Sequence, residues 1–188
     1  MRILLLAAVL LIVPAGPLWA ITGEFPLNSP VFYWYYNPQH EPGWLQGQGR
    51  QWVTEAMQGW EACGIRFVFQ GTTELRPGDR DRVNVVGWDP DLTQGLRGQT
   101  TGTIRSKRSV AVERDVALPP GRLEFAEHPR LLRKVIAHEI GHVLGLDHAG
   151  NCQDVMSYGA DCGRVPPDAL PIAPTENDLQ RCKALYGR

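Results

Sequence analysis

The sequence predicts a single α+β domain: four short strands and two amphipathic helices, followed by an irregular C-terminal stretch that ends in a third helix. Stretches rich in β-branched and aromatic residues, typical of strands, occur at 31–36, 65–69, 82–88 and 109–118. Apolar residues recur at three- and four-residue intervals in 46–63 and 129–144, as in amphipathic helices. Residues 149–174 are rich in proline and glycine and show no periodicity, which favours irregular structure.

The first predicted strand, residues 31–36, is aromatic and lies between prolines. The helix after it spans about residues 46–63 and ends at Gly64, because glycine readily closes a helix. Its apolar stripe, which we interpret as core packing, consists of Trp52, Val53, Ala56, Met57 and Trp60. Apolar residues alternate along the second strand, 65–69, so one of its faces is expected to pack on the core.

The third strand, residues 82–88, follows a turn sequence at 77–79. Residues 89–108 show little periodicity and predict a long irregular loop, with a short strand at 103–105 at most. The fourth strand is expected at 109–118, where apolar anchors recur.

Two further helices complete the predicted elements. The first begins near Pro129, because proline is tolerated in the first turn of a helix. Its apolar stripe consists of Leu132, Val135, Ile136, Ile140, Val143 and Leu144. The last helix begins after Thr175, a residue type that caps helix N-termini, and runs to Tyr186.

The most informative motif lies on the helix near Pro129, where the pattern H-E-x-x-H-x-x-G-x-x-H begins at His138. His138 and His142 are four residues apart and share a helix face, so both imidazoles can reach one metal ion. A glycine follows three residues later and favours a left-handed helix end, which lets His148 supply a third nitrogen. Three neutral imidazoles leave one tetrahedral position of zinc for water, as in catalytic sites. Glu139 lies off the ligand face, where it can act on that water as a general base.

Other interpretations of the histidines are less favoured. A histidine pair on a helix can be a solvated polar face, but the added glycine and third histidine make coincidence rare. The remaining histidines, His40 and His128, lack such spacing and are interpreted as surface residues. A zinc- or peptide-binding module without turnover is the main alternative, although a structural site needs neither Glu139 nor an open coordination position. A purely structural domain would bind no stoichiometric zinc.

The N-terminus has the features of a secretory signal: a basic residue at Arg2, an apolar run at 3–13 and a small residue, Ala20, at the cleavage point. The run is shorter than the roughly twenty residues of a membrane span, so we expect no stable membrane anchor. We therefore predict a secreted protein, extracellular or periplasmic, with residues 1–20 as the signal peptide and 21–188 as one domain.

The charge of the chain argues against a nucleic-acid partner. Arg2 is one of 19 basic residues, so its removal with the signal leaves 18 against 20 acidic residues and a formal net charge of −2. Proteins that bind nucleic acid are usually strongly basic. The basic cluster of Arg105, Lys107 and Arg108 is interpreted as a solvated loop.

All four cysteines follow the signal, and an even number in an oxidising compartment favours two disulfides. The sequence alone leaves three pairings open. We favour Cys152 with Cys162, which closes a short loop after the histidine motif, and Cys63 with Cys182, which joins the first helix to the last. A second metal site is less favoured because the cysteines lack paired C-x-x-C spacing.

A second feature accompanies the histidine motif: residues 154–158 read Asp-Val-Met-Ser-Tyr and place Met156 shortly after His148. Together the two features resemble the metzincin clan of zinc metallopeptidases, in which a methionine-bearing turn, the Met-turn, forms the floor beneath the zinc ligands. Within the clan, the chain most resembles the secreted matrixin-like peptidases. Further matches to that family are residues 34–36, 56–60, 65–67 and 177–187.

The resemblance implies a twisted, mostly parallel small sheet and a zinc-dependent endopeptidase. It identifies His138, His142 and His148 as zinc ligands. Glu139 would be the general base for a zinc-activated water that attacks a peptide bond. The partner would be a polypeptide substrate, extended along an edge strand ahead of the zinc helix, and we expect residues 109–118 to be that strand.

The chain departs from the matrixin pattern at three places. Ala149 stands where matrixins usually have serine after the third histidine. Tyr158 is similar to a tyrosine that astacins and serralysins bring near the metal, although a packed aromatic explains it equally well. Residues 21–29 contain no cysteine, so we expect no matrixin-type propeptide whose cysteine blocks the zinc.

Calcium is a candidate second cofactor, because Asp79, Asp81, Asp89 and Asp91 gather in loops. Solvated turns explain these aspartates as well. The sequence predicts neither the cleavage preference nor the oligomeric state.

Overall fold

The computed structural model describes residues 26–92, 95–105, 110–158, 162 and 165–186. The predicted signal peptide, residues 1–20, lies outside these residues, as do Lys107 and Arg108 of the predicted basic cluster. None of the helices in the described part of the chain is both long and apolar enough to cross a membrane.

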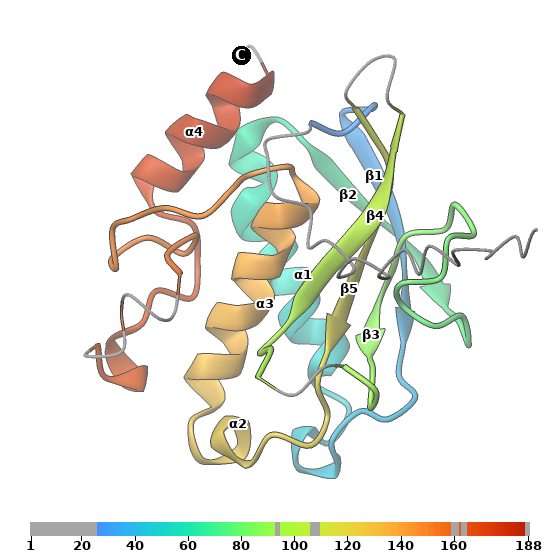
Figure 1. The fold of residues 1–188 in the computed structure, drawn as a ribbon, viewed down its shortest axis with the longest axis vertical. Helices are drawn as coiled ribbons and strands as arrows, with labels where there is room; N and C mark the ends of the chain where they lie inside the picture. The colour runs from blue at the N-terminus through green and yellow to red at the C-terminus, as the bar shows by residue number, and fades with distance from the viewer. Residues whose placement is uncertain (1–25, 93–94, 106–109, 159–161, 163–164, 187–188) are drawn as a thin grey trace, which may run out of the picture.

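A five-stranded sheet forms one layer of the molecule (Figure 1). Its strands are β1 (Val31–Asn37), β2 (Arg66–Thr72), β3 (Val85–Trp88), β4 (Gln99–Arg105) and β5 (Val110–Leu118). The strand order is β2-β1-β3-β5-β4. The β1–β2, β1–β3 and β3–β5 pairs are parallel, whereas β4 runs antiparallel to β5. The predicted α+β class with a mostly parallel sheet is confirmed.

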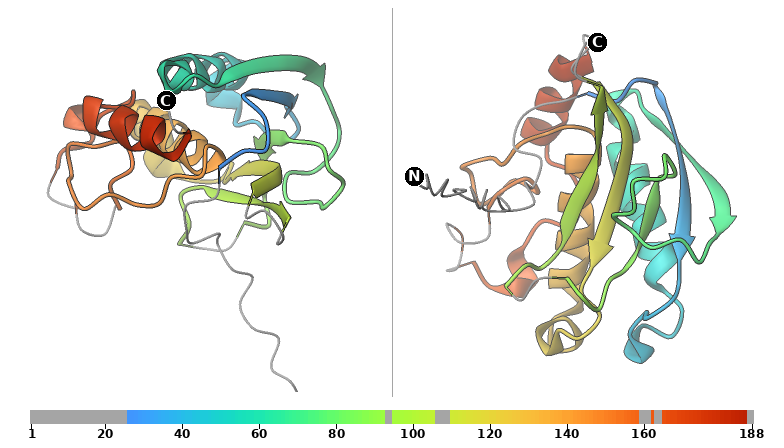
Figure 2. Two further views of the ribbon diagram at one scale, coloured as in Figure 1. Left: turned by 90° about the horizontal axis from the view of Figure 1, so that it is seen from above. Right: turned by 45° about the vertical axis from the view of Figure 1, so that its right-hand side comes forward.

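Helices form the second layer. The α-helices of the described residues are α1 (Gly49–Trp60), α2 (Leu123–Glu127), α3 (Pro129–Val143) and α4 (Glu176–Tyr186). Short 3-10 turns lie at Gly43–Leu45, Glu61–Cys63 and Pro167–Ala169. The views in Figures 1 and 2 show α1 and α3 side by side on one face of the sheet, with α4 on the outer side of this pair.

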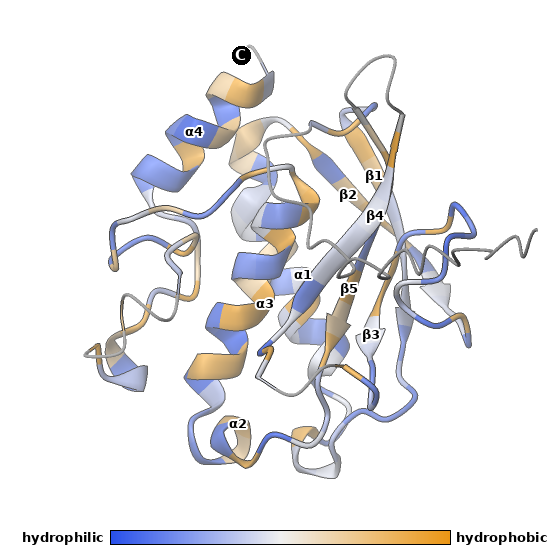
Figure 3. Ribbon diagram, viewed as in Figure 1, coloured by the Kyte–Doolittle hydropathy of each residue, from blue (hydrophilic) through white to orange (hydrophobic). Residues whose placement is uncertain are grey.

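The core lies between the α1–α3 pair and the sheet. Hydrophobic and hydrophilic residues alternate along α3 (Figure 3), and its fully buried members are Leu132, Ile136, Ala137, Ile140 and Val143. Trp60 at the end of α1 donates a hydrogen bond from Nε1 to the Ala137 carbonyl at 2.9 Å. Gly141 allows close packing, because a Cβ at this position would overlap the sulfur of Met156. The helix α3, which carries the first two histidines, is therefore held by α1, by the sheet and by the turn that contains Met156.

The sheet departs from the sequence prediction at β4. This strand spans Gln99–Arg105, whereas only residues 103–105 were expected as a strand. Its threonine-rich sequence has no apolar alternation, and the strand is formed by antiparallel pairing with β5. As a result, β5 lies between β3 and β4, so the prediction that residues 109–118 form an edge strand is wrong. On this side of the sheet the edge strand is β4, and on the opposite side it is β2.

Two smaller differences have local causes. The short helix α2 was not predicted, and His128 separates it from α3. The strand β3 begins at Val85 rather than at residue 82, because Arg82 adopts a left-handed φ of 70°. The Arg82 N–H donates to Glu113 Oε1 at 2.7 Å instead of joining the sheet.

Two disulfides connect the irregular C-terminal half to itself and to the core. Cys63 is bonded to Cys182 of α4, and Cys152 is bonded to Cys162. Both favoured pairings are thus confirmed. The predicted start of α4 is also confirmed, because Thr175 Oγ1 accepts a hydrogen bond from the Asp178 N–H at 3.2 Å.

Candidate metal centre

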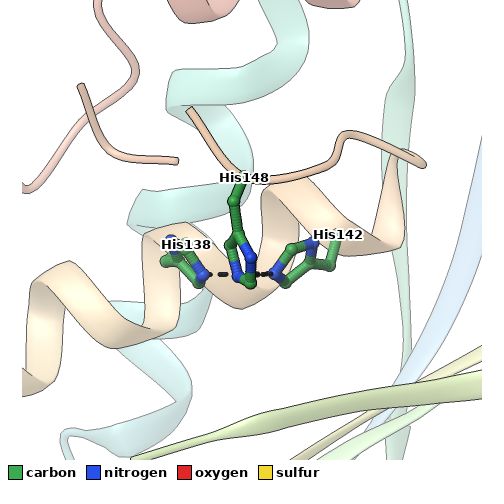
Figure 4. A group of neighbouring side chains, drawn as sticks. All are labelled: His138, His142 and His148. Carbon is green, nitrogen blue, oxygen red and sulfur yellow. Dashed lines mark hydrogen bonds between the residues drawn. The ribbon is translucent and has the colours of Figure 1, made fainter. Parts of the chain in front are cut away.

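The three histidines of the motif converge on one point, as Figure 4 shows. His142 Nε2 lies 3.1 Å from His138 Nε2 and 3.2 Å from His148 Nε2. One candidate ligand atom from each residue lies within 4.8 Å of the others. In the part of the chain that the structure describes, they form the only such group of three or more His, Cys, Asp or Glu side chains.

The C-terminal end of α3 brings the third histidine back to the helix. Gly145 has a left-handed φ of 92°. Its N–H donates to the His142 carbonyl at 2.9 Å, and the Leu146 N–H donates to the Gly141 carbonyl at 3.1 Å. This pair of bonds is the Schellman arrangement, which ends a helix and reverses the chain. The chain reversal predicted from the glycine is confirmed, and it places His148 beside the two ligand candidates on α3.

Backbone carbonyls fix the orientation of both rings on α3. His138 Nδ1 lies 2.8 Å from the Val155 carbonyl oxygen, and His142 Nδ1 lies 2.7 Å from the Leu146 carbonyl oxygen. A carbonyl only accepts hydrogen bonds, so each Nδ1 carries the proton and donates it. Each Nε2 therefore keeps a free lone pair directed toward the other rings, which is the tautomer that binds metals.

Burial also keeps these rings uncharged. It lowers the pKa of His138 well below the usual value and lowers the pKa of His142 as well. The pKa of His148 is lowered by partial burial and by the neighbouring His142. Near pH 7, all three side chains are therefore neutral imidazoles that can donate a lone pair.

This donor set fits a zinc ion. Tetrahedral zinc with Zn–N distances of about 2.0–2.1 Å separates its ligand nitrogens by roughly 3.3 Å. The Nε2 separations of 3.1 and 3.2 Å are close to that value. Three lone pairs that are directed at one point repel one another unless a cation lies between them. Imidazole nitrogen is a common ligand of zinc. The residues present are thus those that a three-histidine zinc site requires.

Glu139 lies on α3 directly after the first histidine. Its side chain is buried, and its Oε2 accepts a hydrogen bond from Thr100 Oγ1 at 2.7 Å. Burial raises the pKa of Glu139 to about 7, while the Thr100 hydrogen bond acts in the opposite direction. A carboxyl group with a pKa near neutrality can both accept and release a proton.

Met156 lies in a turn against α3, as the resemblance to the Met-turn implied. The turn is held by Asp178 of α4, whose Oδ2 accepts from the Val155 N–H at 2.8 Å and whose Oδ1 accepts from the Met156 N–H at 3.3 Å. The Val155 carbonyl in turn accepts the hydrogen bond of His138. Asp178 therefore supports the first histidine through the backbone of the turn.

Sequence patterns do not identify three buried polar residues around the centre: Thr100, Lys134 and Asp178. Thr100 belongs to a segment without periodicity, so it carries no signal. Lys134 donates from Nζ to the Ser157 carbonyl at 3.0 Å, and because Arg133 precedes it, the sequence does not mark it as buried. Asp178 belongs to a helix-capping pattern at the start of α4. That pattern alone accounts for an aspartate at this position, so the sequence gives no sign of its contact with the Met156 turn.

Tyr158 lies next to the centre but is half exposed. Its ring centroid is 4.9 Å from that of His148. This position agrees with a packed aromatic and with a group near the metal, so a catalytic role for Tyr158 stays a prediction.

Three of the four aspartates considered for calcium make other contacts. Asp89 and Asp91 accept hydrogen bonds from Arg76 at 2.6 and 2.8 Å, so a cation already lies between them. Asp81 accepts from the Val83 N–H within its own turn. Calcium binding stays an untested prediction.

Comparisons with known proteins point to one family. The family model described as Matrixin matches residues 49–187. No curated protein matches the chain. A chain of a solved structure described as the GM1-bound form of the ECX AB5 holotoxin is similar, with a TM-score of 0.57 and 16% identity over 88% of this chain and 86% of that chain. Archaemetzincin from Methanopyrus kandleri is similar, with a TM-score of 0.50 and 16% identity over 86% of this chain and 98% of that chain.

At these identities the two solved structures show a shared fold only. The family model goes further, because its match includes α1, every later strand and helix, the histidine motif and the turn of Met156. A peptidase of this family acts on polypeptides and uses zinc, in agreement with the three-histidine group. The chain therefore belongs to the matrixin family of zinc metallopeptidases.

Proposed function

We propose that this matrixin is a secreted endopeptidase in which His138, His142 and His148 bind the zinc ion and Glu139 is the general base. The observation that carries the proposal is the convergence of three neutral imidazole Nε2 atoms, together with the buried carboxyl group of Glu139, which interacts electrostatically with His148. Secretion is supported by the signal-like residues 1–20 and by the two disulfides, which persist in oxidising compartments.

The side chains of the centre would share the work of peptide hydrolysis. When bound, zinc lowers the pKa of water to about 7 and polarises a carbonyl group. The Val155 and Leu146 carbonyls hold the Nδ1 protons, so that the histidines keep their Nε2 lone pairs directed at the centre. Glu139 takes a proton from the attacking water and delivers it to the leaving amine nitrogen.

The edge strand β4 is the proposed binding surface for the substrate backbone. One side of β4 pairs with β5, and the described residues place no strand on its other side. Thr100 of β4 contacts Glu139, so the strand passes directly beside the carboxyl group. An extended peptide that pairs with β4 would therefore carry its backbone past the general base.

A cleavage assay on a mixed peptide library tests this function. We expect the purified protein to cut peptides at internal bonds, to lose this activity with a zinc chelator and to regain it on addition of zinc. A zinc-loaded protein that leaves the whole library uncut would contradict the proposal. Such a result would favour the alternative of a zinc- or peptide-binding module without turnover.

A further inference from the structure

We propose that Thr100 is a positioning residue for Glu139: its hydroxyl holds one carboxyl oxygen of Glu139, so that the other oxygen is the one available for proton transfer. This inference rests on the proposed role of Glu139 as general base. It assigns a function to a segment of β4 that has no recognisable sequence motif.

The first observation is the contact itself. Thr100 Oγ1 lies 2.7 Å from Glu139 Oε2 and 3.0 Å from the Glu139 backbone oxygen. A hydroxyl has one proton to donate, and the shorter contact assigns it to the carboxyl oxygen. Both residues are only 6% exposed, so water does not compete for this bond. The Thr100 hydroxyl thus fixes the Glu139 carboxyl group relative to the backbone of α3.

The register of the sheet explains why a threonine occurs here. Thr100 pairs with Val116 of β5, and Val116 is completely buried. Paired residues in adjacent strands place their side chains on the same face, so Thr100 points into the core toward α3. A buried hydroxyl requires a hydrogen-bond partner. At this core-facing position, the partner is Glu139.

The second observation is the packing of Gly98, which lies two residues before Thr100 and immediately before β4. A Cβ at Gly98 would lie 2.9 Å from Glu139 Oε1 and 2.9 Å from Glu139 Cγ. The carboxyl group therefore lies directly against the Gly98 backbone. Gly98 restricts the side chain by contact and Thr100 restricts it by a hydrogen bond, and the two restraints act on different oxygens.

A fixed orientation matters because proton transfer requires a donor and an acceptor at hydrogen-bond distance in a defined geometry. Without the Thr100 hydroxyl, the carboxyl group can rotate about its last torsion and spend part of its time misdirected. The loss should therefore affect the chemical step, while substrate binding and the three histidines stay unchanged.

The test compares Thr100→Val, which keeps the shape and removes the hydroxyl, with Thr100→Ser, which keeps the hydroxyl. Thr54→Val is the matched control, because Thr54 Oγ1 also donates a hydrogen bond, to the Arg50 carbonyl, but lies on α1. We would measure kcat, KM and zinc content for each zinc-loaded protein. Thr100→Val is expected to lower kcat about ten- to a hundredfold, as for loss of a hydrogen bond to a charged group. KM and zinc content should be unchanged, Thr100→Ser should restore kcat, and Thr54→Val should match wild type.

Two results would overturn the inference: a Thr100→Val enzyme with wild-type kcat, or a Thr100→Ser enzyme as slow as Thr100→Val. If Thr100→Val does not fold, Thr100→Ala, which also lacks the hydroxyl, takes its place in the comparison with Thr100→Ser. Thr100→Ala is then expected to lower kcat with unchanged KM and zinc content, and a wild-type kcat in Thr100→Ala would refute the inference. Glu139→Gln is measured in parallel to separate the two proposals. If Glu139→Gln is inactive and Thr100→Val is fully active, only the positioning role of Thr100 is refuted. If Glu139→Gln is active, the proposed role of Glu139 as general base is refuted.

Discussion

Glu139 and the three histidines lie within eleven residues, yet their side chains have separate environments. The two histidines on α3 donate to backbone carbonyls, whereas Glu139 accepts from a side chain of the sheet. The proposed metal-binding and proton-transfer roles can therefore be separated by mutation, because Glu139 is held by Thr100, whereas His138 and His142 are held by the Val155 and Leu146 carbonyls.

Glu139→Ala should retain zinc but lose catalysis. General-base catalysis typically contributes about a hundred- to ten-thousandfold to the rate, so kcat/KM should fall by a factor in that range. Peptide cleavage and zinc content are measured on the same sample. A variant that retains zinc and cleaves at nearly the wild-type rate would show that another group removes the proton.

Asp115 should make the stability of the fold depend on pH. Burial raises its pKa from 3.8 to about 7, although its carboxylate accepts N–H bonds from Val85 and Gly78. Between about pH 4 and 7 the folded protein retains a proton that the unfolded chain has released, so stability falls as the pH rises through this window. The slope is at most about 1.4 kcal/mol per pH unit.

Asp115→Asn cannot ionise and provides the reference for this effect. Urea unfolding of both proteins from pH 5 to pH 8 gives the difference in their unfolding free energies. We expect the wild type to lose stability relative to the variant as the pH rises to about 7 and to level off above it. A difference that does not vary with pH would mean that Asp115 ionises in the fold as it does in water.

At the scale of elements, the sequence predicts the helices and strands that have a local apolar period. It does not predict a strand that forms only by pairing with another strand. The helices α1, α3 and α4 follow from apolar spacing and end signals, and the three-histidine group follows from one short motif that begins on α3 and ends in the turn after it. The strand β4 cannot be predicted in this way, because its three threonines and one glycine form a strand only by pairing with β5. Thr100 is 39 residues away from Glu139 in the chain, so only the sheet order brings the two together.

The contact between α4 and the Met156 turn should stabilise both the fold and the zinc centre. Asp178→Asn retains the shape but weakens the acceptors for Val155 and Met156, at a cost of about 2 kcal/mol for hydrogen bonds to a buried charge. Because Val155 orients His138, zinc affinity should also fall, about tenfold or more. Urea unfolding and zinc competition titrations measure the two effects. The exposed Asp168→Asn variant is the control, and equal behaviour of the two variants would exclude this role of α4.

At the scale of the whole molecule, the two disulfides should differ in their effect on stability. Cys63 and Cys182 are separated by 119 residues, whereas Cys152 and Cys162 are separated by 10. Cross-linking a longer loop removes more entropy from the unfolded chain, about 5 kcal/mol for the first bond and about 3 kcal/mol for the second. Replacing each pair with alanine and comparing unfolding free energies tests this order. A larger loss from the short loop would contradict it.

The fold as a whole leads to one claim: the helix α3, packed on the sheet, and the chain that turns back after Gly145 together bring three imidazole nitrogens to one zinc ion. Zinc K-edge X-ray absorption of the purified, dialysed protein tests this claim most directly. We expect one zinc per chain with nitrogen or oxygen neighbours at about 2.0–2.1 Å, three of them imidazoles, and loss of this signal in His148→Ala. A sulfur neighbour at about 2.3 Å, or a spectrum unchanged by His148→Ala, would show that zinc binds elsewhere.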